Sequence, residues 1–247
     1  IQNFLFCGLG LMGIGISYFM QKNAQFKNIF YTFLGLSLLY LGIATAQTFD
    51  GTTLATVFAL EALILVYLSY ARIKDYALTH LTSLSFAIPI VMSIEHLEPR
   101  NLEYFLNSPS LIVLITIALT TGLASYIIPK LKPKNDNYPI GSAVLGIISF
   151  LYSLRTIWLI NESLFQSYSF AKGVSLMTYT LVGLFTLWNG THNKQKISTI
   201  IGQSLLTIVT LRLLLTEAWQ MTDTYRMLTF SIIGILFIAT AFYKKNK

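Results

Sequence analysis

The chain has 247 residues, of which 54% are hydrophobic and only 11% are charged, and its formal net charge is +7. Soluble domains average about 25% charged residues, so this composition excludes an ordinary soluble domain and indicates an integral membrane protein. The single cysteine, Cys7, excludes an intrachain disulfide and a cysteine-based metal site.

Nine apolar stretches, each long enough to cross most of a bilayer, follow one another along the chain. They are 4–20, 29–47, 54–71, 78–95, 111–129, 139–160, 173–189, 198–216 and 227–243. A helix rises about 1.5 Å per residue, and the stretches are too long and too uniformly apolar for barrel strands. The predicted fold class is all-α, a polytopic bundle of nine transmembrane helices in one domain over residues 1–247.

The first stretch follows neither an initiator methionine nor a basic leader. We therefore expect the chain to be the C-terminal part of a longer polypeptide. Its expected partners are the lipid bilayer and either another membrane protein or upstream spans of the same polypeptide.

The loops between the stretches alternate in charge. One set of loops is basic and holds twelve Lys or Arg and two acids; it consists of 21–28, 72–77, 130–138, 190–197 and 244–247. The loops that alternate with these hold most of the other acids, and their charged residues include Glu162 and Lys172. The positive-inside rule then predicts an outer N-terminus and a cytoplasmic C-terminus. The net charge is a topology signal, so no nucleic-acid partner is expected. Trp158, Trp188 and Trp219 fall at predicted span ends, which is typical of interface anchors.

Three ionisable residues lie inside the predicted spans, namely Glu61, Arg155 and Arg212. Such residues usually face the bundle interior or water and pair with each other. Counting along each span places Glu61 near mid-depth and both arginines in the outer half. We therefore predict that Glu61 pairs with Arg155 or Arg212, because the guanidinium fork matches a carboxylate. Tyr152 lies one turn from Arg155 and could join them.

Two further charged residues, Glu217 and Arg226, are expected just above this cluster at the outer surface. The cluster has three interpretations. It is a buried ion pair that fixes helix register, or a cavity open to the outside that binds an anionic or zwitterionic ligand, or Arg212 alone reaches the interface. The sequence has no metal-binding or cofactor-binding motif in a suitable structural context. GLGLMG (8–13) fits a dinucleotide-binding fingerprint, but it lies inside a predicted span.

The C-terminal run RLLLTEAWQMTDTYRMLTFSIIGILFIATAFYKK (212–245) resembles the closing segment of a family of large, uncharacterised bacterial inner-membrane proteins, which form a domain of unknown function. The resemblance rests on Arg212, Glu217, Tyr225-Arg226, Gly234 and Lys244-Lys245. The run FDGTTLATVFALEALILVYLSY (49–70) also looks like that family's segment with a glutamate inside an apolar helix. The resemblance implies a bacterial inner-membrane location, and it implies no chemistry because the family's activity is not established.

The leading functional hypothesis is transport or ligand handling through an outward-facing polar cavity. One alternative is a structural or scaffold subunit of a membrane complex. The other is an integral-membrane transferase that acts on a lipid-linked envelope substrate, with Glu61 or Glu217 as base.

Overall fold

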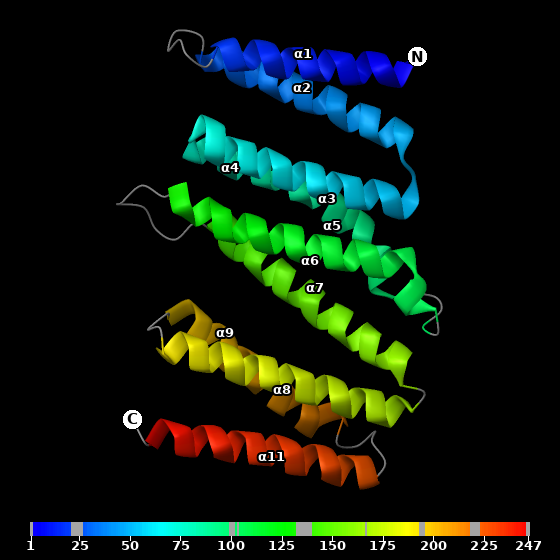
Figure 1. Ribbon diagram of the computed structural model, residues 1–247, viewed down its shortest axis with the longest axis vertical. Coiled ribbons are helices and arrows are strands. Elements are labelled where there is room, and N and C mark those ends of the chain that lie inside the picture. The colour runs from blue at the N-terminus through cyan, green and yellow to red at the C-terminus, as the bar shows by residue number, and fades with distance from the viewer. Residues whose placement is uncertain are drawn as a thin grey trace. The chain divides into compact units, whose positions relative to one another are not determined.

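The computed structural model describes residues 2–20, 27–98, 102, 104–131, 140–165, 167–192, 196–217 and 223–245. Within these residues the chain is helical and has no strand, which confirms the all-α class (Figure 1). The chain divides into two compact units, one of residues 1–100 and 107–153 and one of residues 101–106 and 154–247. The single domain over the whole chain stays a prediction.

The first unit is a series of helical hairpins and includes the first part of α7. Its helices are α1 (Gln2–Met20), α2 (Lys27–Thr48), α3 (Gly51–Leu68), α4 (Tyr76–Ser83), α5 (Ala87–Ser93), α6 (Pro109–Ile127) and the start of α7 (Ile140–Leu164). The turn from α2 into α3 is tight because Gly51 has a φ of +54°, a conformation that glycine adopts without strain. At the other end of α3, Asp75 caps α4 by accepting a hydrogen bond from Leu78 N at 3.2 Å.

Short irregular helices join these elements. They are the π-helical η2 (Ser69–Ile73) and the 3₁₀ segments η3 (Leu84–Phe86), η4 (Ile94–Leu97), η5 (Phe105–Asn107) and η6 (Ile128–Leu131). The segment η3 divides the predicted fourth span into α4 and α5. This segment includes the residue four positions before Pro89. The ring of a proline clashes with the carbonyl group of the residue four positions earlier, which disturbs the helix there.

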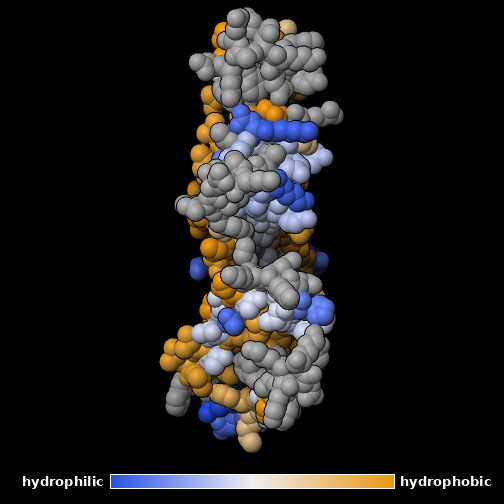
Figure 2. All heavy atoms as spheres, turned by 90° about the vertical axis from the view of Figure 1, so that its left-hand side faces the viewer, coloured by the Kyte–Doolittle hydropathy of each residue, from blue (hydrophilic) through white to orange (hydrophobic). Residues whose placement is uncertain are grey.

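On α3, small residues face the interior of the first unit and large apolar residues face outward. On α3 the buried residues are Ala55, Ala59, Ala62 and Val66, which recur at helical spacing, and α3 packs against α6. Exposed leucines and isoleucines cover the outer faces, and orange hydrophobic side chains are prominent along the edges of the face in Figure 2. This arrangement is typical of helices that pack in lipid.

The second unit contains the rest of α7 with α8 (Tyr168–His192), α9 (Lys196–Arg212), the π-helical η7 (Leu213–Glu217) and α11 (Asp223–Lys245). The helix α8 packs against both α9 and α11. Glycines allow α8 and α9 to approach closely: a Cβ atom on Gly202 would lie 2.5 Å from the backbone nitrogen of Leu187. A Cβ atom on Gly190 would lie 2.4 Å from the backbone nitrogen of Thr199.

Six segments of the described residues are long and apolar enough to span a membrane. They are Gly51–Ala71, Leu78–Leu97, Pro109–Lys130, Gly141–Leu164, Ser169–His192 and Ser198–Leu215. These segments support a polytopic membrane protein. The total of nine spans and the orientation of the termini stay predictions.

Two residues lie in helices instead of the expected loop because the helices extend beyond the apolar stretches. Lys172 and Glu162 were expected in an outer loop, but they lie in α8 and α7, and Lys172 is only 2% exposed. Trp158 is 7% exposed and packs inside the second unit, and its expected place at the membrane interface stays a prediction. Trp188 is an exposed residue of α8, and Trp219 lies outside the described residues.

Candidate functional site

Arg155 and Arg212 line the same cavity in the second unit. The cavity has a volume of about 180 Å³ and lies among α7, α8 and α9. Its lining consists of Leu154, Arg155, Trp158, Leu176, Tyr179, Leu205, Ile208, Val209 and Arg212. Among these residues there are two guanidinium groups and no carboxylate, so the described lining carries net positive charge.

The Trp158 side chain connects Arg212 to a carboxylate of α7. The guanidinium carbon of Arg212 lies 4.0 Å from the centroid of the Trp158 ring, a cation–π distance. The indole Nε1 of Trp158 donates a hydrogen bond to Glu162 Oε2 at 3.1 Å. Residues 155, 158 and 162 are spaced three and four apart and so share one face of α7. The helical spacing therefore brings Arg155 and the Trp158–Glu162 pair to the same side of the helix.

Tyr179 of α8 completes the polar part of the cavity. Its hydroxyl donates a hydrogen bond to the Leu154 carbonyl oxygen at 2.6 Å, which joins α8 to α7. Tyr179 lines the same cavity as Arg212 and Arg155. The sequence analysis did not single out Tyr179. A count along the helices could have found it, because Arg155 and Tyr179 lie at similar distances from the end of α7 and the start of α8, which follow each other in the chain.

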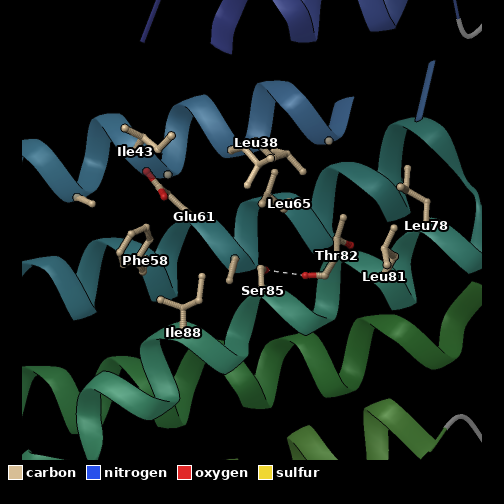
Figure 3. A pocket seen from close by; sticks show the side chains of 15 residues that line it. Leu38, Ile43, Phe58, Glu61, Leu65, Leu78, Leu81, Thr82, Ser85 and Ile88 are labelled. Carbon is tan, nitrogen blue, oxygen red and sulfur yellow. Dashed lines mark hydrogen bonds between the residues drawn. The ribbon is translucent and has the colours of Figure 1, made fainter. Parts of the chain in front are cut away.

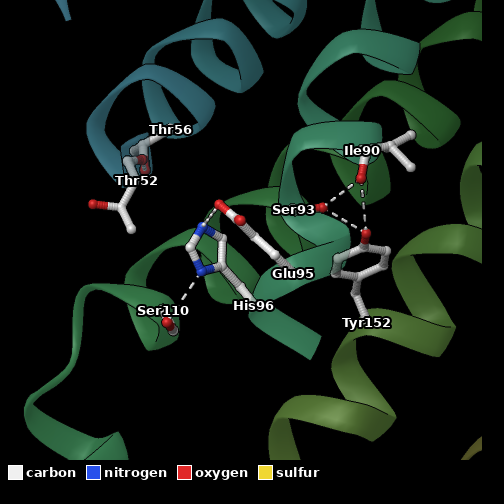
Figure 4. Close-up of polar contacts among 8 residues, drawn as sticks. All are labelled: Thr52, Thr56, Ile90, Ser93, Glu95, His96, Ser110 and Tyr152. Atoms are coloured by element: carbon white, nitrogen blue, oxygen red, sulfur yellow. Dashed lines mark hydrogen bonds and ion pairs between the residues drawn. The ribbon is translucent and has the colours of Figure 1, made fainter. Parts of the chain in front are cut away.

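Tyr152 takes part in a different contact, within the first unit. Its hydroxyl lies 2.6 Å from Ser93 Oγ and 3.3 Å from the Ile90 carbonyl oxygen, and Ser93 Oγ also donates to that carbonyl at 2.7 Å (Figure 4). The Ile94 N–H bonds to Val91 O at the end of α5, where 3₁₀ geometry begins. The two hydroxyl groups therefore satisfy a carbonyl at a change in helix type. Tyr152 is not part of the described lining of the two-arginine cavity.

Glu61 lines a second, larger cavity in the first unit. Thr45 of α2 donates a hydrogen bond from Oγ1 to Glu61 Oε1 at 2.5 Å, and the glutamate side chain is half-buried. The cavity has a volume of about 470 Å³ and an almost entirely apolar lining. The pairing of Glu61 with Arg155 or Arg212 would join the two units and stays a prediction.

The remaining predicted site residues lie around the start of α11. Arg226 Nη2 lies 3.3 Å from Asp223 Oδ1, one turn earlier in the same helix. Asp223 is 92% exposed, so this ion pair is worth little in stability. Glu217 ends η7, and its side chain lies outside the described part of the structure.

A further polar group joins η4 to the start of α6 in the first unit. His96 is buried, and its Nδ1 lies 3.1 Å from Ser110 Oγ, while its Nε2 lies 3.6 Å from Glu95 Oε1 (Figure 4). Among the described residues no group of three or more His, Cys, Asp or Glu could hold a metal ion.

Comparison with family models gives a match over most of the chain. The family model described as "Predicted membrane protein (DUF2339)" matches residues 78–245. This segment contains every residue of the two-arginine cavity and the C-terminal run 212–245. The run 49–70, which also resembles the family, precedes the matched segment. No curated protein and no solved structure matches the chain.

Proposed function

The chain belongs to the DUF2339 family of predicted membrane proteins of unknown function, and we propose that it binds a small anion at the two-arginine cavity. In this proposal the cavity opens toward the outer side of a bacterial inner membrane and serves transport or ligand handling. The observation that carries it is the convergence of Arg155 and Arg212, from two different helices, on one cavity.

Charge and donor geometry support an anionic ligand. Charged residues within spans are costly to insert, at about 2.5–3.5 kcal/mol each on insertion scales, and they mark ligand pathways in many membrane proteins. Guanidinium groups present planar forks of N–H donors, which match carboxylate and phosphate oxygens. The Trp158 ring holds Arg212 from one side, so that its guanidinium position is fixed before a ligand arrives.

The volume of the cavity limits the size of the bound group. Sites for drug-sized ligands are about 300–1,000 Å³, and this cavity of about 180 Å³ lies below that range. It therefore suits a small carboxylate or phosphate, or the anionic head of a longer molecule whose remainder stays outside.

The scaffold alternative is favoured by one observation in the same place. The Trp158 ring contacts Arg212 on its face and Glu162 through its N–H, so charged groups of α7 and α9 are already tied together. Such a network can fix the register of two helices without binding any ligand. The two functions differ in whether added anions stabilise the protein.

Thermal unfolding of the full chain in phosphatidylcholine nanodiscs tests the proposal. We expect inorganic phosphate or acetate to raise the unfolding midpoint in a saturable manner, because a ligand that binds only the folded state stabilises it. The variants Arg155→Gln and Arg212→Gln should lose this rise, and Lys130→Gln should keep it, because Lys130 lies over the Tyr126 ring in the other unit. An equal response in all four proteins would contradict the proposal and favour the scaffold.

A further inference from the structure

The larger cavity, in the first unit, has a different chemistry from the two-arginine cavity. It lies between α2, α3 and the α4–α5 segment, and its walls are formed mainly by apolar residues such as Leu38, Ile43, Phe58 and Leu65 (Figure 3). Its volume of about 470 Å³ lies within the range of sites for drug-sized ligands. The cavity is therefore large enough to enclose most of an amphipathic molecule.

Glu61 is the one ionisable residue of this lining among the residues that the structure describes. The lining also contains Thr82 and Ser85, but both hydroxyls donate to backbone carbonyls of their own segment, Thr82 to Thr79 O at 3.0 Å and Ser85 to Thr82 O at 2.6 Å. Figure 3 shows the Glu61 carboxylate extending from α3 toward α2, beside Ile43. The polar character of the cavity is thus concentrated in a single carboxylate.

Thr45 holds this carboxylate in position. Its hydroxyl is buried and donates to Oε1 across the α2–α3 interface, so the glutamate side chain is oriented by a neighbouring helix. A hydroxyl group supplies no countercharge. A negative charge in an apolar cavity favours a ligand that brings a positive charge with it.

The route into the cavity is apolar as well. Several lining residues are also exposed on the outer surface of the unit, among them Leu39, Leu81 and Ile88. An exposed apolar surface of this kind is suited to contact with lipid. A ligand that reaches the cavity from this side must therefore dissolve in the hydrocarbon region.

We propose that this cavity is a binding site for a lipophilic monovalent cation, whose apolar body contacts the cavity walls and whose charge is neutralised by Glu61. The site is distinct from the two-arginine cavity in position and in charge. The residues from Gly35 to Leu65 that form two of its walls precede the segment that matches the family, whereas the third wall, from Leu78 to Ile88, lies within that segment.

Saturable binding of radiolabelled tetraphenylphosphonium to the full chain in phosphatidylcholine nanodiscs tests this proposal. Empty nanodiscs correct for partition into lipid, and triphenylphosphine oxide serves as the neutral analogue. We expect the wild-type chain to bind the cation and the neutral analogue to displace it poorly. Glu61→Gln should weaken binding by roughly tenfold or more, because it removes a charge-assisted contact. Glu95→Gln is the matched control and should bind as the wild type does, since Glu95 is 74% exposed and is not part of the lining.

A second variant keeps the test decisive if Glu61→Gln does not fold. A Cβ atom on Gly35 would have nothing within 4 Å, so Gly35→Leu can fill part of the cavity while leaving Glu61 in place. We expect it to weaken tetraphenylphosphonium binding as well. Wild-type binding in a folded Glu61→Gln or Gly35→Leu protein would overturn the proposal. Equal displacement by triphenylphosphine oxide would also overturn it, because it would indicate a site for neutral apolar molecules such as lipid chains.

Discussion

The guanidinium carbon of Arg212 lies 4.0 Å from the ring centroid of Trp158, and the N–H of the same indole donates to Glu162. One aromatic residue on α7 thus contacts a cation of α9 with its face and an anion of its own helix with its edge. The contact holds Arg212 at the two-arginine cavity, and it gives Trp158 a role inside the second unit.

Two variants of Trp158 should destabilise the protein by different amounts, because one loses only the hydrogen bond to Glu162 and the other also loses the contact with Arg212. Trp158→Phe keeps an aromatic face for Arg212 but loses the hydrogen bond to Glu162, so we expect a loss of about 1 kcal/mol in the free energy of unfolding. Trp158→Leu also loses the cation–π contact, which adds about 1–2 kcal/mol. Unfolding in mixed micelles measures both. Trp188→Phe, at an exposed position of α8, is the control and should change little. Equal stability of the Phe and Leu variants would contradict the cation–π contact.

Close approach of α8 and α9 should make Gly202 intolerant of any side chain. A Cβ atom there would lie 2.5 Å from Leu187 N and 2.8 Å from Leu187 Cα, which are backbone atoms that cannot rotate away. We expect Gly202→Ala to cost about 1–3 kcal/mol of stability, the usual range for overpacking. Gly234→Ala is the matched control in α11, because a Cβ atom at Gly234 meets nothing within 4 Å. Comparable unfolding midpoints for the two variants would rule out the tight α8–α9 packing.

The Tyr152 hydroxyl should stabilise the junction of α5 and α7. Tyr152→Phe removes the contacts with Ser93 Oγ at 2.6 Å and with the Ile90 carbonyl oxygen at 3.3 Å. The expected loss is about 1–2 kcal/mol in the free energy of unfolding, because the remaining buried groups lose a hydrogen-bond partner. Tyr67→Phe, at an exposed position of α3, should have no measurable effect. Hydrogen exchange can localise the change, which should appear at the end of α5.

The predicted orientation can be checked with single cysteines in a Cys7→Ser background. The loop that contains Lys74 is basic and should face the cytoplasm, while Glu98 lies on an acidic loop that should face outward. A membrane-impermeant maleimide should therefore label Glu98→Cys in intact cells and Lys74→Cys only after the membrane is disrupted. The opposite labelling pattern would reverse the topology.

Hydropathy predicted the six segments that are long and apolar enough to span a membrane, because the hydrocarbon core selects for apolar residues over a fixed length. It underestimated helix length at the interfaces, where polar residues can continue a helix. The apolar stretch 173–189 corresponds to α8, which runs from Tyr168 to His192. Lys172 was consequently placed in a loop, although it is a buried residue of the first turns of α8.

The side-chain partners of the charges within the predicted spans could not be predicted from the sequence. Arg155 and Arg212 were expected at similar depth, and the structure places both at one cavity. Tyr179 and Thr45 were missed because a hydropathy pattern does not fix how each helix is rotated about its axis. Thr45 is one of many hydroxyl residues in the spans, and only the packing of α2 on α3 brings its hydroxyl to Glu61.

The central claim is that Arg155 and Arg212 act together on one anion, and a double-mutant cycle tests it most directly. Phosphate binding to the chain in nanodiscs would be measured by calorimetry for the wild type, Arg155→Gln, Arg212→Gln and the double variant. We expect each single variant to lose roughly tenfold or more in affinity, and the double variant to lose less than the product of the two single losses, because the arginines share one ligand. Phosphate affinity that is unchanged in both single variants would contradict the claim.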